Sequence, residues 1–303
     1  MFLLREAKPI RRLLLATGRD RARRPPDIVQ IEATNICNAK CTFCPRDDMD
    51  RRQGTMSMEL YQKIVNECAE LGIRHVRMHN YGEAFLDRQL PAKIAYAKQR
   101  GIPEVGVITN GSILGPEVAR AVIEAGLDAI NISLDAAGKE TFESTRLGLK
   151  YDKVMSNLEG FLRIRQELGR RRPKLILSFV RQGNSAEEQA FIDRWSAVAD
   201  KVHITELHNW AGTLDQPSDV HFPCYRQWLS FTVLWDGRVS LCCADFDGKV
   251  VLGDLRTETI DQIWNSEGYQ RTRREHLTSG GPEICRSCNL PTKDSPLWIR
   301  ELF

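Results

Sequence analysis

The sequence has no long hydrophobic run and no marked excess of charge of either sign. Its longest apolar stretches, Leu13–Ala16 and Leu175–Val180, fall far short of the roughly 18 residues of a membrane-spanning helix, so no membrane span is expected. Lys and Arg number 43 against 40 Asp and Glu, and this net charge of +3 gives little reason to expect nucleic-acid binding. With 42% hydrophobic residues and no low-complexity tract, the chain is neither disordered, nor collagen, nor a coiled coil.

A secretion signal is also missing. The basic start lacks the long apolar stretch and small-residue cleavage site of a signal peptide, so a cytoplasmic location is expected. Residues 1–26 form a basic arm, for which a solvated amphipathic helix, a membrane surface and an anionic substrate are the competing explanations. Because a reducing cytosol keeps thiols free, the 9 cysteines need an explanation other than disulfides.

The cysteines fall into two groups that are far apart in the sequence. The first is a CxxxCxxC motif and the second ends in a CxxC motif; their members are Cys37, Cys41 and Cys44, and Cys224, Cys242, Cys243, Cys285 and Cys288. Cys68 stands alone on the apolar stripe of an expected helix, where a cysteine is usually a core residue. Two groups of sulfur ligands predict two metal sites.

Apolar runs rich in Val and Ile alternate with amphipathic stretches over residues 27–208. Six such repeats predict an α/β fold with a parallel sheet, open or curved into a barrel. The expected strands are Ile28–Ala33, His75–His79, Val105–Thr109, Ala129–Leu134, Leu175–Val180 and Val202–Leu207, and the expected helices are Met58–Leu71, Gln89–Arg100, Pro116–Ala125, Tyr151–Leu168 and Ala186–Ala199. Ser57 is an expected N-cap, and Ser185 with Glu188 has the spacing of a capping box.

From about residue 209 the rhythm changes, which predicts a second, smaller unit over residues 209–303. Trp228–Trp235 and Arg238–Leu241 flank Asp236-Gly237, a pattern typical of a β-hairpin with a primed turn. A short helix at Ile260–Asn265 and a basic helix at Tyr269–Leu277 are expected before the CxxC motif.

The CxxxCxxC motif follows the first expected strand, at the end of the sheet where parallel α/β folds build their sites. Three thiolates hold one face of a metal centre, whereas a closed iron–sulfur cluster or a structural zinc takes four ligands. One coordination position is therefore left open for a substrate or cofactor. The alternative is a zinc site completed by a distant residue such as His75 or His79.

The first motif reads C-N-A-K-C-T-F-C and resembles the signature of the radical S-adenosylmethionine (SAM) superfamily, with Phe43 in its aromatic position. Three further segments resemble motifs of that family in order after successive strands. They are Tyr81-Gly82-Glu83-Ala84, Thr109-Asn110-Gly111, and Ser133-Leu134-Asp135. The first resembles the GGEP-type motif that receives the methionyl amino group of SAM in this family, with Ala84 in place of proline. Arg146 matches in spacing the arginine that, with the serine, meets the SAM carboxylate in this family.

This resemblance covers roughly residues 27–208 and implies a partial (β/α)6 TIM-like barrel. It implies a 4Fe-4S cluster on Cys37, Cys41 and Cys44, with SAM as the second cofactor and an external electron donor such as flavodoxin or ferredoxin. The residues implied to bind the cofactor are Phe43, Tyr81, Gly82, Glu83, Thr109, Asn110, Ser133, Asp135 and Arg146. The implied chemistry is cleavage of SAM to a 5′-deoxyadenosyl radical that takes a hydrogen atom from a substrate.

The second cysteine group is compatible with a structural zinc ribbon on Cys224, Cys242, Cys285 and Cys288. Its spacing, with Trp235-Asp236-Gly237 in the hairpin, also resembles the SPASM/twitch extension that holds auxiliary 4Fe-4S clusters. Because no cysteine follows Cys288, the resemblance implies one auxiliary cluster, as in twitch enzymes such as 2-deoxy-scyllo-inosamine dehydrogenase.

Four thiolates complete such a cluster, so Cys243 is left over, either as a small buried residue or as a reactive thiol. Because an S–H bond is weaker than most C–H bonds, Cys243 is a candidate hydrogen-atom donor, and a hydrogen atom returned to the opposite face of a carbon radical inverts that centre. The assignment can also be reversed, with Cys243 as the cluster ligand and Cys242 as the thiol left over.

The leading interpretation is a radical SAM epimerase that acts on a small polyhydroxylated molecule such as a carbohydrate or cyclitol. The first alternative is a dehydrogenase, with the auxiliary cluster as electron acceptor and Asp245, Asp247 or Arg181 as base. A peptide maturase and a metal-binding scaffold without turnover are the others. Trp195, Trp210, Tyr225 and Trp228 are candidates for a sugar site, although such aromatic residues more often belong to a core.

Overall fold

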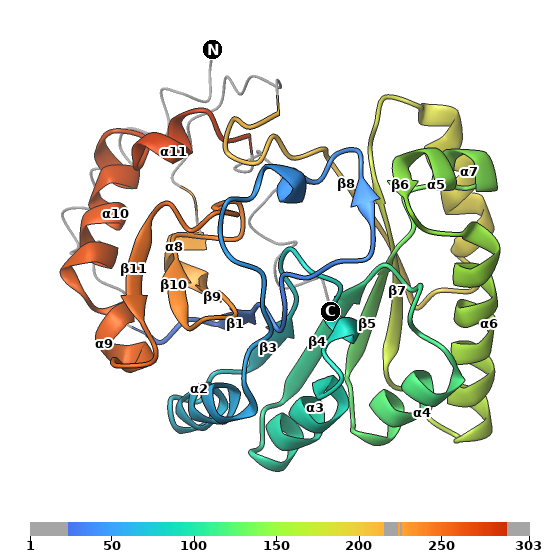
Figure 1. The fold of residues 1–303 in the computed structure, drawn as a ribbon, viewed down its shortest axis with the longest axis horizontal. Coiled ribbons are helices and arrows are strands. Elements are labelled where there is room, and N and C mark those ends of the chain that lie inside the picture. The colour runs from blue at the N-terminus through green and yellow to red at the C-terminus, as the bar shows by residue number, and fades with distance from the viewer. Residues whose placement is uncertain (1–23, 215–223, 225, 290–303) are drawn as a thin grey trace.

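The computed structural model describes residues 24–214, 224 and 226–289. Residues 1–23 of the basic arm lie outside the described residues. So do Tyr225 and the C-terminal tail from residue 290. The central feature is a nine-stranded sheet in the order β11-β10-β9-β1-β3-β4-β5-β7-β8 (Figure 1). The strands are β1 (Ile28–Ile31), β3 (His75–Met78), β4 (Glu104–Thr109), β5 (Ala129–Ser133), β7 (Lys174–Val180), β8 (Lys201–Thr205), β9 (Ser230–Val233), β10 (Arg238–Ser240) and β11 (Val251–Asp254).

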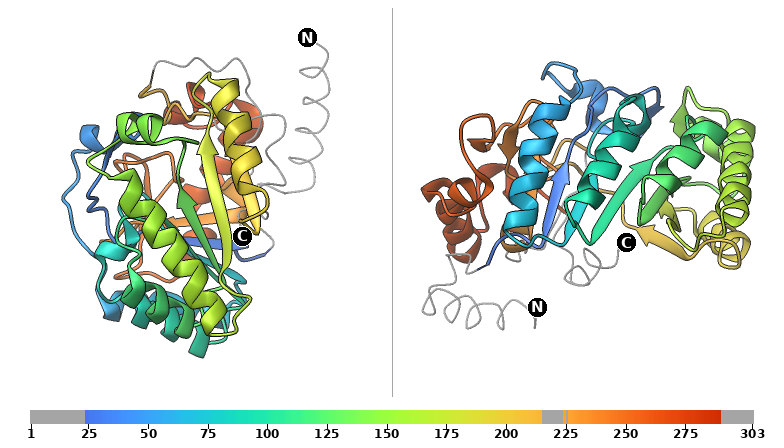
Figure 2. Two further views of the ribbon diagram at one scale, coloured as in Figure 1. Left: turned by 90° about the vertical axis from the view of Figure 1, so that its right-hand side faces the viewer. Right: turned by 90° about the horizontal axis from the view of Figure 1, so that it is seen from below.

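The six expected strands of the first unit are all present, and their neighbours in the sheet pair in parallel. Helices connect them and cover the outer, convex face of the curved sheet (Figures 1 and 2). These helices are α2 (Met58–Glu70), α3 (Leu90–Gln99), α4 (Pro116–Glu124), α6 (Tyr151–Glu167) and α7 (Ser185–Trp195). The architecture is that of a partial (β/α)6 barrel, as predicted.

The two faces of the strands differ in chemistry because successive side chains point to opposite sides. Outward residues such as Val29, Val76 and Val107 are fully buried against the helices, and Cys68 joins this core, which confirms its assignment as a core residue. The inner face carries polar side chains instead, including Gln30, Arg77, Asn131, Ser178 and His203, all of them buried. A packed TIM barrel has an apolar interior, so a polar one is suited to a polar ligand.

Two details of local structure differ from the prediction. Helix α7 begins one residue earlier than expected, and Asn184, not Ser185, is its N-cap, accepting from the backbone N of Glu187. The capping box is therefore absent, and Glu188 pairs with Arg181 instead. The N-cap of α2 is Ser57 as predicted, since its side chain accepts from the backbone N of Leu60.

The predicted hairpin is present as β9 and β10, but its turn is not a primed one. The Gly237 backbone N donates to Leu234 O at 2.9 Å, and Gly237 has a φ of +93°. Among the described residues, the non-glycine residues with positive φ are Asp135, Trp210 and Ala211. Asp236 therefore does not adopt the left-handed conformation that a type I′ turn requires. The turn therefore spans Leu234–Gly237 and ends in a left-handed glycine.

The hairpin also extends the barrel sheet, because β9 pairs in parallel with β1. The sequence pattern did not show this pairing or strand β11, since the paired segments are about 200 residues apart and β11 is short. The remaining helices are α8 (Arg226–Leu229), α9 (Ile260–Trp264), α10 (Glu267–Thr278) and α11 (Glu283–Arg286). Across the described ranges, no helix has the length and apolar character needed to cross a membrane.

Candidate functional site

The CxxxCxxC loop is tied to a segment more than a hundred residues away. Strand β2 (Lys40–Cys41) pairs in antiparallel fashion with β6 (Arg146–Leu147), and Cys41 lies directly opposite Arg146. The backbone N of Thr42 donates to Thr145 O at 2.9 Å, which extends the pairing by one bond. This two-stranded ribbon places the first cysteine group and the predicted SAM-carboxylate arginine side by side.

The three thiols of this loop form one electrostatic neighbourhood. Burial raises the pKa of Cys37, Cys41 and Cys44, that of Cys44 to about 12, and the negative charges of Cys41 and Cys37 contribute to the increase at Cys44. Thiols in this setting stay protonated until a cationic metal centre replaces the protons. Three sulfur donors fit a cluster with one open iron, as the resemblance implies.

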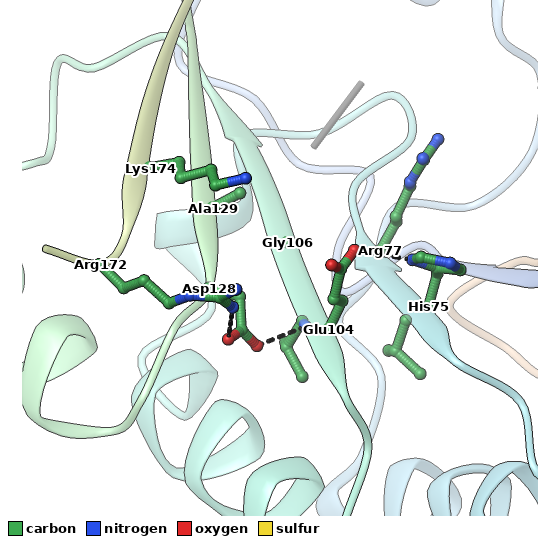
Figure 3. A pocket seen from close by; sticks show the side chains of 10 residues that line it. His75, Arg77, Glu104, Gly106, Asp128, Ala129, Arg172 and Lys174 are labelled. Carbon is green, nitrogen blue, oxygen red and sulfur yellow. Dashed lines mark hydrogen bonds and ion pairs between the residues drawn. The ribbon is translucent and has the colours of Figure 1, made fainter. Parts of the chain in front are cut away.

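The zinc alternative with His75 finds no support in the geometry. His75 lies at the opposite end of β3, where its Nδ1 is 2.9 Å from Glu104 Oε2 (Figure 3). Within the described part of the chain, no three His, Cys, Asp or Glu side chains converge closely enough to hold a single ion. A cubane cluster distributes its thiolates over separate irons and does not need such convergence.

Arg146 connects two of the predicted motifs. Its guanidinium forms a buried ion pair with Asp135, lies 3.6 Å from Cys41 Sγ and stands over the Phe43 ring at 5.8 Å. Asp135 in turn accepts from the Val180 backbone N at 2.8 Å. The Nε of Arg146 is buried without a hydrogen-bond partner among the described residues, so it still has a donor to offer to a ligand carboxylate. Arg146 therefore suits the carboxylate of SAM.

The Glu83 carboxylate joins the loops that follow β3 and β4. It accepts hydrogen bonds from the Thr109 hydroxyl at 2.7 Å, the Asn110 backbone N at 2.7 Å and the Phe85 backbone N at 3.2 Å. Burial raises its pKa, although these hydrogen bonds and the charge of Arg146 oppose that increase. Three of its roughly four acceptor positions are thus used inside the protein. One position remains for the ammonium group that the resemblance assigns to this motif.

Asn110 is likewise engaged within the protein. Its Nδ2 donates to Asn38 Oδ1 at 2.9 Å, and its Oδ1 accepts from the Ser112 backbone N and hydroxyl at 2.9 and 2.7 Å. Asn38 lies between Cys37 and Cys41, so this network holds the cysteine loop against the Thr-Asn-Gly loop. Ser133, at the end of β5, half-buried, is 3.4 Å from the Ser178 hydroxyl on β7.

Gly82 is required by the approach of the protein's own backbone. A Cβ at this position would lie 2.1 Å from Thr34 O and 2.8 Å from Ile36 O, in the segment that leads into Cys37. The resemblance to the radical SAM family implies that Gly82 binds the cofactor. The observed neighbour is the loop before the cysteine motif, to which the Glu83 backbone N also donates at 2.9 Å.

A Gly82→Ala variant is therefore expected to lose at least about 3 kcal/mol of unfolding free energy, because a backbone clash has no rotamer that relieves it. Gly160→Ala is the matched control, since its Cβ would have no atom within 4 Å and α6 gains from the substitution. Urea unfolding of both variants measures the difference. Equal stabilities would contradict the close packing of these two loops.

Aromatic residues join the first cysteine group to the second. The Tyr81 hydroxyl donates to Cys243 O, and the Tyr81 ring makes edge contacts with Trp210 at 5.6 Å and Phe246 at 6.0 Å. Trp210 Nε1 donates to Phe43 O at 2.7 Å. Of the other candidate aromatics, Trp195 belongs to the core. No sequence motif pointed to Phe246 as a residue of the site.

Four thiols of the second group lie close enough together for their charges to interact. Cys224 and Cys288 are each 8% exposed, and the Cys288 backbone N donates to Cys285 O at 3.3 Å. Burial raises the pKa of Cys242 strongly, and the charges of Cys243, Cys285, Cys224 and Cys288 raise it further. Four thiolates are the set that a closed iron–sulfur cluster needs.

Cys243 has a second set of neighbours. The charge of Cys243 acts on Arg77, on the inner face of β3, whereas Cys242 packs against Ala244 and Cys288. Both thiols act on Tyr81, and Cys243 also acts on Cys224. The two adjacent thiols thus differ in surroundings, one beside the C-terminal CxxC and one beside the barrel interior.

A buried ion pair that sequence reasoning missed connects both regions. Arg51, seven residues after Cys44, makes two hydrogen bonds of 2.6 and 2.5 Å to the Glu32 carboxylate at the end of β1. Its Nε donates to Phe246 O at 2.5 Å, and the Asp247 carboxylate accepts from the backbone N of Asp50 at 2.9 Å and of Arg51 at 3.1 Å. No local motif marks these residues, because each partner comes from a different segment.

Comparison with known proteins identifies both parts of the chain. Residues 31–167 match the radical SAM superfamily, and residues 224–289 match the SPASM iron-sulfur cluster-binding domain. Among solved structures, BtrN in complex with AdoMet and 2-DOIA has a TM-score of 0.62 at 19% identity, covering 87% of this chain and 93% of that one. Native anSMEcpe with bound AdoMet has a TM-score of 0.63 at 16% identity, covering 88% and 91%. At such identities these structures show the fold alone.

Curated relatives are named GTP 3',8-cyclases. One from Chlorobaculum tepidum is 33% identical over 144 residues, 47% of this chain and 43% of that protein. A probable one from Metallosphaera sedula is 30% identical over 193 residues, 62% of this chain and 58% of that protein. The chain thus spans about half the length of the curated relatives it matches.

The radical SAM domain implies SAM and a 4Fe-4S cluster, and the SPASM domain implies auxiliary iron–sulfur clusters. The predicted superfamily, fold and cofactor classes are thereby confirmed, while the roles of single residues stay predictions. The chain carries a radical SAM domain followed by a SPASM iron–sulfur cluster-binding domain.

Proposed function

We propose that this enzyme removes a hydrogen atom from a small polar molecule and returns one from Cys243, which inverts a carbon centre. The sulfur-centred radical left on Cys243 would regain the thiol by taking one electron from the auxiliary cluster and one proton from solvent. When bound, SAM and its cluster supply the 5′-deoxyadenosyl radical that starts the reaction. Cys37, Cys41 and Cys44 would hold that cluster, and Cys224, Cys242, Cys285 and Cys288 would hold the auxiliary one. Ser133 and Arg146 would orient the SAM carboxylate.

The observation that carries this proposal is the different surroundings of Cys242 and Cys243. Cys242 interacts with the other three thiols of its group, which favours it as the cluster ligand. The charge of Cys243, and not that of Cys242, acts on Arg77 on the inner face of β3, which favours Cys243 as the thiol beside the barrel interior where a substrate would lie. Its peptide carbonyl accepts from the Tyr81 hydroxyl, which holds the backbone at this residue.

The dehydrogenase alternative is weakened by the state of its candidate bases. The Asp245 carboxylate accepts from the backbone N of Lys249 and Val250 at 2.8 and 3.0 Å. Asp247 accepts from two backbone N atoms, and Arg181 pairs with Glu188 and Glu206. Each of these groups is engaged within the protein, which leaves Cys243 as the group better placed to act on the substrate.

Reaction in deuterated water tests the proposal. The reduced, reconstituted enzyme is incubated with SAM and a panel of sugars, cyclitols and nucleotides, and each recovered compound is analysed by mass spectrometry and NMR. One deuterium on carbon is expected in the epimerised product, because the exchangeable thiol hydrogen of Cys243 becomes a carbon-bound one. Cys243→Ala should form 5′-deoxyadenosine without the epimer, and Cys68→Ala serves as the control thiol. A product two mass units lighter and an active Cys243→Ala would contradict the epimerase.

A second candidate is the cyclisation of GTP, favoured by the printed names of the relatives at 30 to 33% identity. The same incubation distinguishes it, since cyclisation consumes GTP and yields an isomer of the same mass without deuterium. In either case an external donor such as flavodoxin or ferredoxin would supply the electron.

A further inference from the structure

Three neutral polar side chains lie next to one another on the inner face of the sheet, in the strands that join the two cysteine groups. Thr232 of β9 is opposite Gln30 of β1 on one side and Ser240 of β10 on the other. Thr232 alternates along β9 with Phe231 and Val233, which belong to the core. Residues opposite one another share a face and lie about 5 Å apart, so these three side chains are neighbours. All three residues are buried, Thr232 with an exposure of 1%.

Asn80, in the loop after β3, adds a fourth polar side chain to this region. Gln30 Nε2 donates to Asn80 Oδ1 at 3.1 Å, so the amide oxygen of Asn80 is used inside the protein. The amide nitrogen, Asn80 Nδ2, is buried and has no hydrogen-bond partner in the described part of the chain. The same holds for Thr232 Oγ1. Asn80 and Thr232 are both neighbours of Gln30, and each contributes one unused polar atom.

Two separate contacts place this region beside Cys243. Ser240 Oγ donates at 3.2 Å to Cys242 O, the carbonyl of the peptide bond that leads into Cys243. Tyr81, the residue after Asn80, donates from its hydroxyl to Cys243 O. The peptide groups on both sides of Cys243 are therefore held by immediate neighbours of the two side chains with unused atoms.

The unused atoms define the chemical group that would complete them. The amide nitrogen of Asn80 only donates, whereas the Thr232 hydroxyl donates or accepts. A ligand hydroxyl accepts from the first and donates to the second, and it brings no charge among buried neutral side chains. Arg77, which follows Gln30 across the sheet, already interacts inside the protein. Because buried polar groups are costly without partners, a hydroxyl-bearing ligand is the expected partner here.

We propose that Asn80 and Thr232 bind a hydroxyl group of the substrate beside Cys243, so that the substrate is an uncharged polyol where it meets this thiol. The site also gives a reason for a threonine at position 232, since a valine would fill the same space without burying an unused hydroxyl. The inference rests on the proposed function in placing the substrate next to Cys243, but binding of a polyol needs no turnover.

Binding of a neutral cyclic polyol to the reconstituted, SAM-loaded enzyme tests the site. The probe is myo-inositol, and the comparison is cyclohexanecarboxylate, a ring of the same size with a charge and no hydroxyl groups. Both are titrated calorimetrically against the wild type and variants. Affinity for myo-inositol should fall about tenfold in Thr232→Val and remain close to wild type in Thr232→Ser, which restores the hydroxyl. Asn80→Asp, which keeps the acceptor for Gln30 but loses the donor, should also bind about tenfold more weakly.

The matched control is Thr272→Val. The Thr272 hydroxyl is also buried, but it donates to Tyr269 O at 2.9 Å and Gln227 Oε1 at 3.3 Å. This variant should unfold at lower urea concentration and keep its affinity for myo-inositol. Thr232→Val should show the opposite, weaker binding with an unchanged or higher unfolding midpoint, because it removes no hydrogen bond among the described residues. A purely structural Thr232 hydroxyl would lower the midpoint and leave binding unchanged.

Three results would overturn the proposal. They are absence of myo-inositol binding to the wild type, equal affinity in the wild type and Thr232→Val, and tighter binding of cyclohexanecarboxylate than of myo-inositol. An enzyme that binds myo-inositol through Thr232 but gives no carbon-bound deuterium in deuterated water would keep the hydroxyl site and lose the proposed function. Deuterium incorporation without any dependence on Thr232 would keep the function and lose the site.

Discussion

Replacing Cys37, Cys41 and Cys44 together by alanine should lower the iron content of anaerobically reconstituted protein from about eight to about four atoms per chain. SAM cleavage to 5′-deoxyadenosine should cease at the same time. The reason is that the two cysteine groups occupy separate places in the fold. The first is held by the β2–β6 ribbon and the second by the hairpin and α11, so the loss of one leaves the other intact.

Iron, sulfide and zinc are measured on the wild type, on this triple variant and on a Cys285→Ala/Cys288→Ala variant. The second variant should also retain about four iron atoms per chain but keep the ability to cleave SAM, since it removes only the auxiliary site. A wild type with about four iron atoms and one zinc that survives the triple substitution would mean a structural C-terminal site. In that case the hydrogen-return mechanism through Cys243 would have to be abandoned.

An Arg51→Met variant is expected to lose about 3 to 5 kcal/mol of unfolding free energy. Both partners of this pair are nearly inaccessible, with side-chain exposures of 4% for Arg51 and 0% for Glu32. Removing the guanidinium leaves the Glu32 carboxylate buried without its cation and also breaks the bond to Phe246 O. The loss should therefore loosen the contact between the loop after the first cysteine group and the loop after the second.

Urea unfolding of reconstituted protein measures this loss, and the double variant Arg51→Met/Glu32→Met tests its cause. The double variant should be more stable than the sum of the single losses predicts, because no unpaired charge remains. Arg120→Ala is the matched control, since its pair with Glu124 is 3.8 Å long and exposed, and should cost no more than about 0.5 kcal/mol. A loss below about 1 kcal/mol for Arg51→Met would contradict the role of this pair as a buried connection.

Much of the barrel was predictable because its elements are local patterns. Buried strands such as β7 appear as apolar runs, and α2 shows both its N-cap, Ser57, and its buried stripe in the sequence. The errors lie where one residue decides the outcome. At α7, Asn184 and Ser185 are both residue types that favour the N-cap position. Which of the two side chains accepts the capping hydrogen bond depends on where the backbone enters the helix, and here it is Asn184.

The candidate site was predictable to the level of motifs and not of contacts. Sequence spacing pointed to Glu83, Asn110 and Arg146 as site residues. It did not show that the side chains of Glu83 and Asn110 form most of their hydrogen bonds with neighbouring loops. Gly82 was predicted to bind the cofactor, and the close neighbour that the structure shows is the backbone at Thr34. Spacing records which residue types are present, whereas a contact depends on two segments that meet only after folding.

The sequence by itself determined the fold class, the two cysteine groups and the order of the motifs along the strands, because these depend on residue type and on separations of a few residues. Only the tertiary structure decided that β9 extends the barrel sheet and that the Tyr81 hydroxyl donates to the Cys243 carbonyl. Those facts join segments about 150 to 200 residues apart, and such pairings leave no local pattern, since packing and charge select them after the strands are in register.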